Sequence, residues 1–175
     1  MNFDITSHLP EEFENNSRAW VYQSSRLFLI SEALEMETML ENFVSSWKSH
    51  GTPVKGFATL FFGRFIVFLA DERASGVSGC STDSSVHLIK EIEKKFNVEM
   101  FNRQTLAFVV NNKIELIPLA QLSYAIENKF IEAGTIYFNN TVLTKEQVIN
   151  QWMIPAGQSW LKKYFEISRT EKMKG

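Results

Sequence analysis

The segment from Arg73 to Ser85 combines residue types that bind anions. It follows the apolar stretch Phe65–Ala70 and overlaps the start of an amphipathic stretch, Asp83–Phe96, which predicts a helix. A Gly-containing loop between a buried strand and a helix presents free backbone N–H groups, and hydroxyl and guanidinium groups add donors. Helix capping is the alternative explanation of these Ser, Thr and Asp residues. We expect a small anionic ligand here, and the candidate ligand-binding residues are Arg73, Ser78, Gly79, Cys80, Ser81, Thr82, Asp83 and Ser84.

Cys80 supports an alternative hypothesis, a thiol-dependent enzyme or redox protein. A cysteine just before a helix has a lowered pKa, because the helix dipole and free N–H groups stabilise the thiolate. The sequence has no second cysteine, and the nearest histidine, His87, falls on the polar side of the predicted helix, so no activating base is evident. Packing of a small residue behind the loop is the commoner explanation of such a cysteine.

Phe65–Glu72 ends in two acidic residues, as does the metal-side strand of P-loop ATPases. A phosphate-binding loop would have to accompany it, but the pattern G-x-x-x-x-G-K-[ST] does not occur, so we do not expect ATP hydrolysis by this route. The three histidines lack the pair spacing of a zinc site. Asp71, Glu72 and Asp83 have the chemistry to gather around Mg²⁺, although a solvated loop explains them equally well. We expect no metal and no cofactor.

Length and composition indicate one globular domain. The chain has 175 residues, of which 45% are hydrophobic, and 18 Lys and Arg against 20 Asp and Glu give a net charge of −2. This near-balance argues against nucleic-acid binding, which needs a surplus of positive charge. The chain shows no signal-peptide pattern, and no apolar stretch approaches the roughly 20 residues of a membrane helix. We expect a cytoplasmic protein with no nucleic-acid partner and no membrane partner.

The order of predicted elements indicates an α+β fold. Strands are expected at 18–23, 57–62, 65–70 and 104–110. Helices are expected after Ser31, which can cap the first, and at Asp83–Phe96. Strand, helix, strand, strand, helix, strand is the ferredoxin-like βαββαβ order.

Residues outside this unit read as additions to it. We expect a polar N-terminal arm at 1–17 and a single domain at 18–168, in which a core unit spans about 18–110 and an extension about 111–168. A disordered tail is expected at 169–175. The extension begins with a hairpin at Asn111-Asn112 and continues with short helices, a strand at 135–138 and a capping box that starts at Thr144.

The hairpin around Gly63-Arg64 is apolar on both faces of both strands. Something must cover the second face, either the C-terminal third of the chain or a second copy. A homodimer that uses this hairpin or the cluster Trp152–Phe165 is therefore the third hypothesis. Aromatic residues on the predicted strands also suggest RNA binding, but the glycines of the RNA-recognition motif and a basic flank are missing, so we do not expect it.

Two segments, Ser17–Arg26 and Asp71–Val86, resemble a family of small bacterial proteins of uncharacterised function that are often labelled "ABC transporter ATPase". The similarity extends to Phe138–Asn140 and Trp152–Trp160, so it covers nearly the whole chain after the N-terminal arm. Neither a P-loop nor the transporter signature Leu-Ser-Gly-Gly-Gln occurs, and the resemblance assigns no catalytic residue. We therefore expect a small binding or interaction domain.

Overall fold

The computed structural model describes residues 4–49, 51–71 and 79–166, with the backbone alone at 79–82. The chain divides into two compact units, and the single domain expected at 18–168 stays a prediction. The first unit is built from Phe3–Asn102 and Asn140–Ile149, and the second from Arg103–Asn139 and Asn150–Gly175. The expected tail at 169–175 lies outside the described residues.

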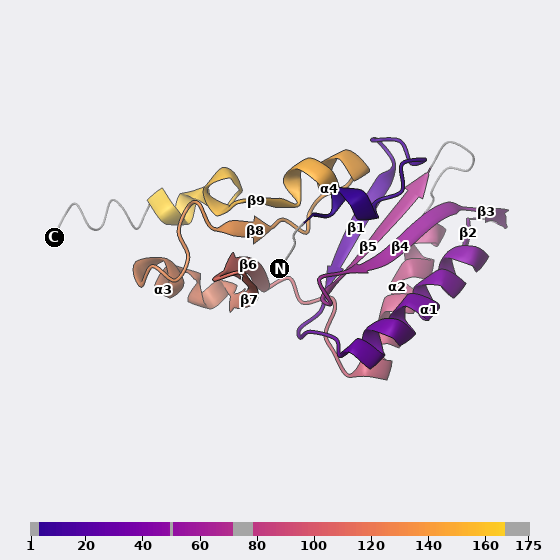
Figure 1. Cartoon of the computed structure of the whole chain (residues 1–175), viewed down its shortest axis with the longest axis horizontal. Helices are drawn as coiled ribbons and strands as arrows, with labels where there is room; N and C mark the ends of the chain where they lie inside the picture. Colours follow the sequence, from indigo (N-terminus) through magenta and orange to yellow (C-terminus); the bar gives the residue numbers. More distant parts are fainter. Residues whose placement is uncertain (1–3, 50, 72–78, 167–175) are drawn as a thin grey trace. The chain divides into compact units, whose positions relative to one another are not determined.

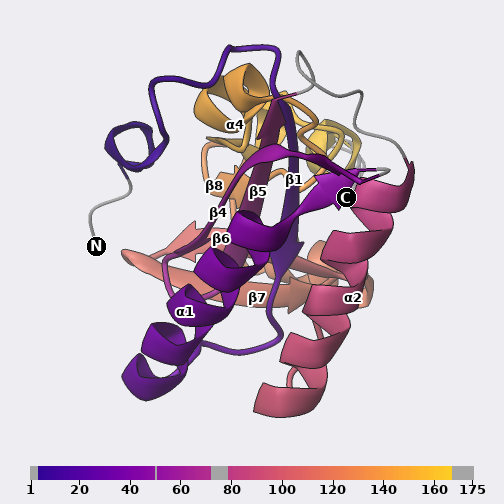
Figure 2. The ribbon, with the colours of Figure 1, turned by 90° about the vertical axis from the view of Figure 1, so that its right-hand side faces the viewer.

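The first unit contains a three-stranded antiparallel sheet in the order β1-β5-β4. Helices α1 and α2 lie side by side on one face of this sheet (Figure 1, Figure 2). The bounds are β1 Arg18–Gln23, α1 Ile30–Ser46, β4 Lys55–Phe61, β5 Phe65–Asp71 and α2 Gly79–Phe96. Three short elements accompany them: the 3-10 helix η1 Thr6–His8 and the paired strands β2 Lys48–Ser49 and β3 Thr52–Pro53.

The core of the first unit lies between the sheet and the two helices. All seven residues of β5 are buried, as expected for a strand that is covered on both faces. Alternate residues of a strand point to opposite faces, so Ile66, Phe68 and Ala70 point toward the helices. There they pack with residues of both helices: Met36, Leu40, Leu88, Ile89, Ile92 and Phe96.

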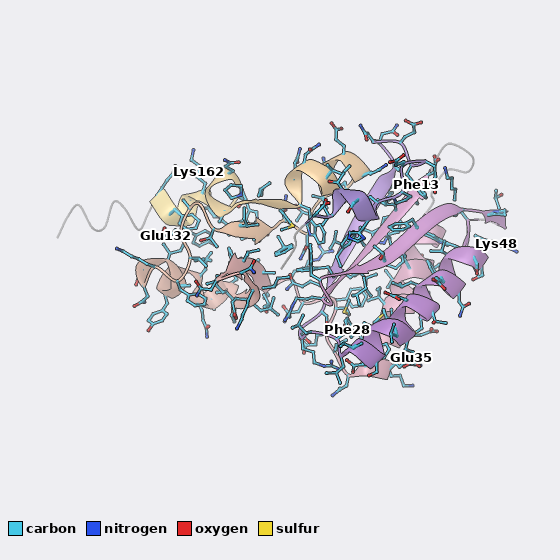
Figure 3. All side chains as sticks on the ribbon, in the orientation of Figure 1. Phe13, Phe28, Glu35, Lys48, Glu132 and Lys162 are labelled. Carbon is cyan, nitrogen blue, oxygen red and sulfur yellow. The ribbon has the colours of Figure 1, made fainter. Side chains whose placement is uncertain are left out.

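The opposite face of the sheet is covered by the chain itself. Phe13 of the N-terminal segment (Figure 3) lies edge-on to Phe57 of β4, with 6.5 Å between the ring centroids. Lys145 fastens this segment by donating hydrogen bonds to the carbonyls of Pro10 and Phe13, at 2.7 and 2.8 Å. The sequence predicted a loose polar arm at 1–17, whereas its described part buries three apolar side chains, Ile5, Leu9 and Phe13.

The fourth strand of the expected ferredoxin-like sheet belongs elsewhere. β1, β4 and β5 have the neighbours that the βαββαβ order predicts, but β6 (Thr105–Val110) joins a sheet in the second unit. The outer edge of β1 is instead occupied by Asn140–Ile149, the return segment, which re-enters the first unit. There the Ala19 N–H donates to the Leu143 carbonyl at 2.9 Å. The fold is therefore a mixed α and β structure with antiparallel sheets, and a continuous βαββαβ sheet is not confirmed.

The start of α1 also differs from the prediction. We expected Ser31 to cap the helix, but the helix begins at Ile30 and Leu29 occupies the cap position. The Glu32 carboxylate accepts a hydrogen bond from the Leu29 N–H at 2.7 Å. Arg26 holds this carboxylate in place through two hydrogen bonds, at 2.7 and 2.8 Å.

The second unit contains a four-stranded antiparallel sheet in the order β7-β6-β8-β9. The predicted turn at Asn111-Asn112 is confirmed, since both residues have positive φ angles, 49° and 60°. The remaining elements are β7 Lys113–Pro118, η2 Leu119–Gln121, α3 Leu122–Glu127, β8 Ile136–Phe138, β9 Met153–Pro155 and η3 Ala156–Gln158. α4 (Lys145–Gln151) begins in the return segment, where Thr144 Oγ1 accepts from the Gln147 N–H as predicted.

The aromatic cluster that we expected at a dimer interface contributes to the core of the second unit. Trp152 is fully buried and lies 5.5 Å from Phe138 between ring centroids. Leu161 and Phe165 pack in one core cluster with residues of β6 and β8. Trp160 remains partly exposed, and its indole N–H donates to the Tyr137 hydroxyl at 3.2 Å. Within the described ranges, none of the helices has the length and hydropathy needed to cross a membrane.

Candidate functional site

The structure describes part of the predicted anion site. Arg73 and Ser78 lie outside the described residues, and of Gly79, Cys80, Ser81 and Thr82 only the backbone is described. α2 begins at Gly79 rather than Asp83, so these last four residues form the first helical turn instead of a loop. The first N–H groups of a helix have no partner within it, and small or hydroxyl residues are well tolerated there. Of the other candidates, Asp83 is exposed and Ser84 is half-buried.

The acidic residue that leads into this segment points away from α2. Asp71 shares the face of β5 opposite to Phe68 and Ala70, because side chains alternate along a strand. Its carboxylate lies 3.7 Å from the Lys55 ammonium on the same face. Asp71 and Asp83 are therefore on opposite sides of the sheet, and the Mg²⁺ site considered above is not formed by these two. Among the described residues, no three His, Cys, Asp or Glu side chains form a group that could hold a metal ion.

Two residues outside the predicted anion site, Arg18 and Trp20, lie beside Ser85, the last residue of the Arg73–Ser85 segment. The indole N–H of Trp20 on β1 donates to Ser85 Oγ, in the second turn of α2, at 3.2 Å. The guanidinium carbon of Arg18 lies 5.7 Å from the centroid of the Trp20 ring. Ser85 is fully buried, Trp20 half-buried and Arg18 exposed.

The position of Trp20 is set by the core. Its ring stacks on Phe68 with a centroid distance of 5.8 Å and an interplanar angle of 13°, and it meets Trp47 edge-on at 5.8 Å. With Trp20 fixed on both sides, the cation–π contact holds the Arg18 charge near the N-terminal turns of α2. The first turn of α2 contains no acidic residue, so both the helix dipole and Arg18 favour a negative charge at this end.

These three residues could not be grouped from the sequence. Residues 18 and 20 are separated from residue 85 by more than sixty positions. They meet because β1 pairs with β5 in the register Trp20↔Phe68, and α2 packs over that face. The available signal was the alternation Arg18, Trp20 and Tyr22 on one face of β1, which sets a cation beside an aromatic residue with a polar N–H.

Other strong polar contacts in the first unit serve the fold. Arg26 and Glu32 form a bidentate pair, which lowers the pKa of Glu32 to about 2. Asn140 Nδ2 donates to Gln23 Oε1 at 2.8 Å, so two of the segments that carry the family resemblance meet here. In the second unit, burial raises the pKa of Tyr137, and the Trp160 hydrogen bond acts in the opposite direction.

The aromatic strands do not offer a surface for stacking bases. Phe65 and Phe68 have no exposed area, because the helices cover one face of β5 and the other face is buried as well. A pocket of about 310 Å³ lies at the opposite edge of the sheet from Arg18 and Trp20, between α1 and β4.

Comparison with known proteins gives no match: no family model, no curated protein and no solved structure is similar to this chain. The resemblance to the small bacterial proteins labelled "ABC transporter ATPase" therefore stays a prediction. Functional inference rests on the residues described above and their geometry.

Proposed function

We propose that this chain is a small binding domain that holds an anionic ligand beside the N-terminal turns of α2. The observation that carries the proposal is the Arg18–Trp20–Ser85 contact, which fixes a guanidinium next to this helix end. An α-helix presents free N–H groups and the positive end of its dipole at its N-terminus. Arg18 adds a full charge and a planar set of donors that suits phosphate or carboxylate.

The surrounding charges support an anion in this place. Asp71 lies on the other face of the sheet and is paired with Lys55, so its charge does not oppose binding directly. Asp83 is the described acidic residue on α2 nearest the helix start, and it is exposed to solvent. Water screens an exposed charge, so its repulsion of the ligand is weak. In this proposal Ser84, half-buried in the same turn, adds a hydroxyl to the ligand-binding groups.

Titration with inorganic phosphate tests the proposal, with binding followed by calorimetry or by backbone amide shifts. We expect Arg18→Gln to weaken phosphate binding about tenfold, because a hydrogen bond to a charged group contributes about 1.5–3 kcal/mol. Lys90→Gln is the matched control: it removes one positive charge from an exposed position farther along α2 and should change affinity less than about twofold. Equal phosphate affinities of Arg18→Gln and Lys90→Gln would contradict the proposed site. So would a Ser84→Ala single variant that binds phosphate as tightly as the wild type.

A thiol-dependent reaction at Cys80 is the second candidate. It is supported by the position of Cys80 in the first turn of an 18-residue helix, where the dipole lowers a thiol pKa. His87 stands seven residues further on, about 10 Å along the helix axis, which is too far for it to act as the base. Alkylation followed across pH discriminates between the two candidates, since a thiol that titrates near about 8.5 has no activation and removes this one.

We further propose that the first unit is a ferredoxin-like arrangement in which the return segment takes the place of the fourth strand. Its support is the strand order β1-β5-β4, the two helices on one face, and the pairing of Ala19 with Leu143. The cytoplasm remains our proposed location, and a homodimer remains the third hypothesis.

A further inference from the structure

The outer edge of β4 is a surface that the anion site does not use. β4 is the last strand of the sheet β1-β5-β4, and no strand within the described ranges pairs with its far side. Proteins usually protect such edges with charged residues, proline or bulges. The central residues Gly56–Leu60 contain neither a charged residue nor a proline. Among the residues that the structure describes, this edge is therefore open to another extended chain.

Hydrogen-bond alternation identifies the residues that face outward. The Ser24 N–H donates to the Arg64 carbonyl at 2.8 Å, and the Ala19 N–H donates away from β5 to Leu143 at 2.9 Å. Even-numbered residues of β5 therefore bond to β1, and its odd-numbered residues bond to the odd-numbered residues of β4. The backbone N–H and C=O groups that point outward are those of Gly56, Ala58 and Leu60.

A groove lies between this edge and α1. The two elements run beside each other in opposite directions, because Leu27, before α1, lies near Gly63, after β4, and Trp47, after α1, lies against Gly56. The groove contains the pocket of about 310 Å³, which is lined by Glu37, Leu40, Glu41, Val44, Gly56, Phe57, Ala58 and Thr59. One stripe of α1 borders it and continues at helical spacing to Leu34 and Ile30, which are 61% and 83% exposed.

The groove is negatively charged. α1 contains four glutamates and neither Lys nor Arg. Two of them are neutralised by ion pairs: Glu32 with Arg26, and Glu35 (Figure 3) with Lys95 at 2.6 Å. In the part of the chain that the structure describes, no cation lies within ion-pair distance of Glu37 or Glu41. These two carboxylates line the pocket and are exposed.

We propose that this groove binds an extended segment of another protein that carries Lys or Arg at alternate positions and adds to β4 as a further strand. The backbone of the segment would bond to Gly56, Ala58 and Leu60, and every second side chain would face α1. Alternate residues of a strand are about 6.8 Å apart, and Glu37 and Glu41 are about 6 Å apart along the helix. Two basic residues on one face of the segment therefore match the two carboxylates.

A second copy of this chain fits the edge less well. Pairing of two β4 strands about a twofold axis would place both α1 helices on the same face of the joined sheet. Glu37 and Glu41 of each copy would then lie along the same seam, where like charges repel. Charge complementarity therefore selects a basic partner.

A synthetic ten-residue peptide of alternating Lys and Val tests the proposal against a peptide of alternating Glu and Val, with binding measured by fluorescence anisotropy. We expect the Lys peptide to bind at least tenfold more tightly and to lose affinity as salt is raised. The double variant Glu37→Gln/Glu41→Gln should weaken the Lys peptide about tenfold. The control double variant Glu91→Gln/Glu127→Gln removes the same net charge at two other exposed glutamates. It should change the affinity for the Lys peptide by less than about twofold.

The role of the backbone is tested separately. Ala58→Pro removes an outward N–H from an edge strand, a position where proline is tolerated, and should abolish binding while the circular dichroism spectrum is unchanged. If Ala58→Pro does not fold, two N-methylated Lys peptides replace it, one methylated at the odd-numbered residues and one at the even-numbered residues. The peptide whose methyl groups point toward β4 is expected not to bind. The proposal would be overturned if both N-methylated peptides bound as tightly as the unmethylated Lys peptide, or if the Glu peptide bound as tightly as the Lys peptide. A dimer of the chain that Ala58→Pro dissociates would do the same by assigning the edge to a second copy.

Discussion

The ionisation of Glu32 is closely tied to the local structure. Its carboxylate accepts two hydrogen bonds from Arg26 and one from the Leu29 N–H, which closes the first turn of α1. The Arg26 hydrogen bonds, and next the Leu29 N–H, lower its pKa from 4.5 to about 2. Because the folded pKa lies below the unfolded one, the ionised carboxylate stabilises the fold above pH 4.5, and this stabilisation is lost as the pH falls toward about 2.

Glu32→Gln should therefore lower the free energy of unfolding at pH 7, and the difference from the wild type should shrink between pH 4.5 and about 2. Urea unfolding at a series of pH values measures it. Glu41→Gln is the control on the same helix, and it should show a smaller effect because Glu41 makes no ion pair in the described part of the chain. A Glu32→Gln deficit that persists unchanged at pH 2 would mean that the amide disturbs packing rather than removing the charge.

Gly56 shows how one residue connects the core to the open edge. A Cβ atom built there lies 2.7 Å from Cζ3 of Trp47 and closer still to Cε3. Trp47 is buried against Trp20 and Phe68, so it has no space to move aside. Glycine is therefore required for the indole to pack beneath β4, and Gly56 also lines the pocket at the surface.

At the scale of elements, the N-terminal segment is attached mainly through lysines. The Lys145 side chain is only 7% exposed, and its ammonium donates to the Pro10 and Phe13 carbonyls. Lys55 donates to the Glu12 carbonyl at 2.9 Å and lies 4.9 Å from the centroid of the Phe13 ring. The segment therefore closes the second face of the sheet without forming a strand.

Lys145→Met should release this segment, because the two carbonyls lose a charged donor and the methionine cannot replace it. We expect the free energy of unfolding to fall by about 1.5–3 kcal/mol and residues 4–17 to be cleaved faster by proteases than in the wild type. Lys162→Met, at an exposed lysine of the second unit, is the control and should change neither quantity measurably. Unchanged protease sensitivity of Lys145→Met would show that burial of Ile5, Leu9 and Phe13 holds the segment by itself.

Elements defined by local patterns were predicted well from the sequence. β1 has the predicted bounds, and the turns at Gly63-Arg64 and Asn111-Asn112 occur where expected, because turn residues and alternating side chains act over a few positions.

The partner of β6 was not predictable in this way. An edge strand such as β1 accepts any extended segment, and here it pairs with residues near Leu143 rather than with β6. The burial of the N-terminal segment did have a signal, an apolar residue at every fourth position from Ile5 to Phe13.

At the scale of the whole molecule, the candidate sites depend on contacts between residues that are far apart in the sequence. The hydroxyl-rich start of α2 was visible as a composition, but Arg18, Trp20 and Ser85 gather only after β1 pairs with β5. The groove beside β4 was not visible, because a strand is known to be an edge only when the sheet order is known. Sequence patterns therefore suggested a kind of ligand, and our proposal that Arg18 holds it depends on the pairing of β1 with β5.

The same structure predicts that the chain sediments as a monomer. The second face of the β4–β5 hairpin is covered by the N-terminal segment, and Trp152, Leu161 and Phe165 are buried in the second unit. Four large aliphatic side chains are exposed close together in the sequence, at and just before the start of α1: Leu27, Leu29, Ile30 and Leu34. Two such patches can meet only if the acidic α1 helices approach each other, and their like charges oppose that approach.

Sedimentation velocity at physiological and at high salt tests this prediction. We expect a monomer at physiological salt, and any association should appear only at high salt, where screening shortens the range of the repulsion. Leu34→Ser should then abolish the association, whereas Tyr124→Ser, at an exposed aromatic residue of the second unit, should not. A stable dimer at physiological salt would contradict the prediction and favour the homodimer hypothesis, and Ala58→Pro would show whether that dimer forms through the edge of β4.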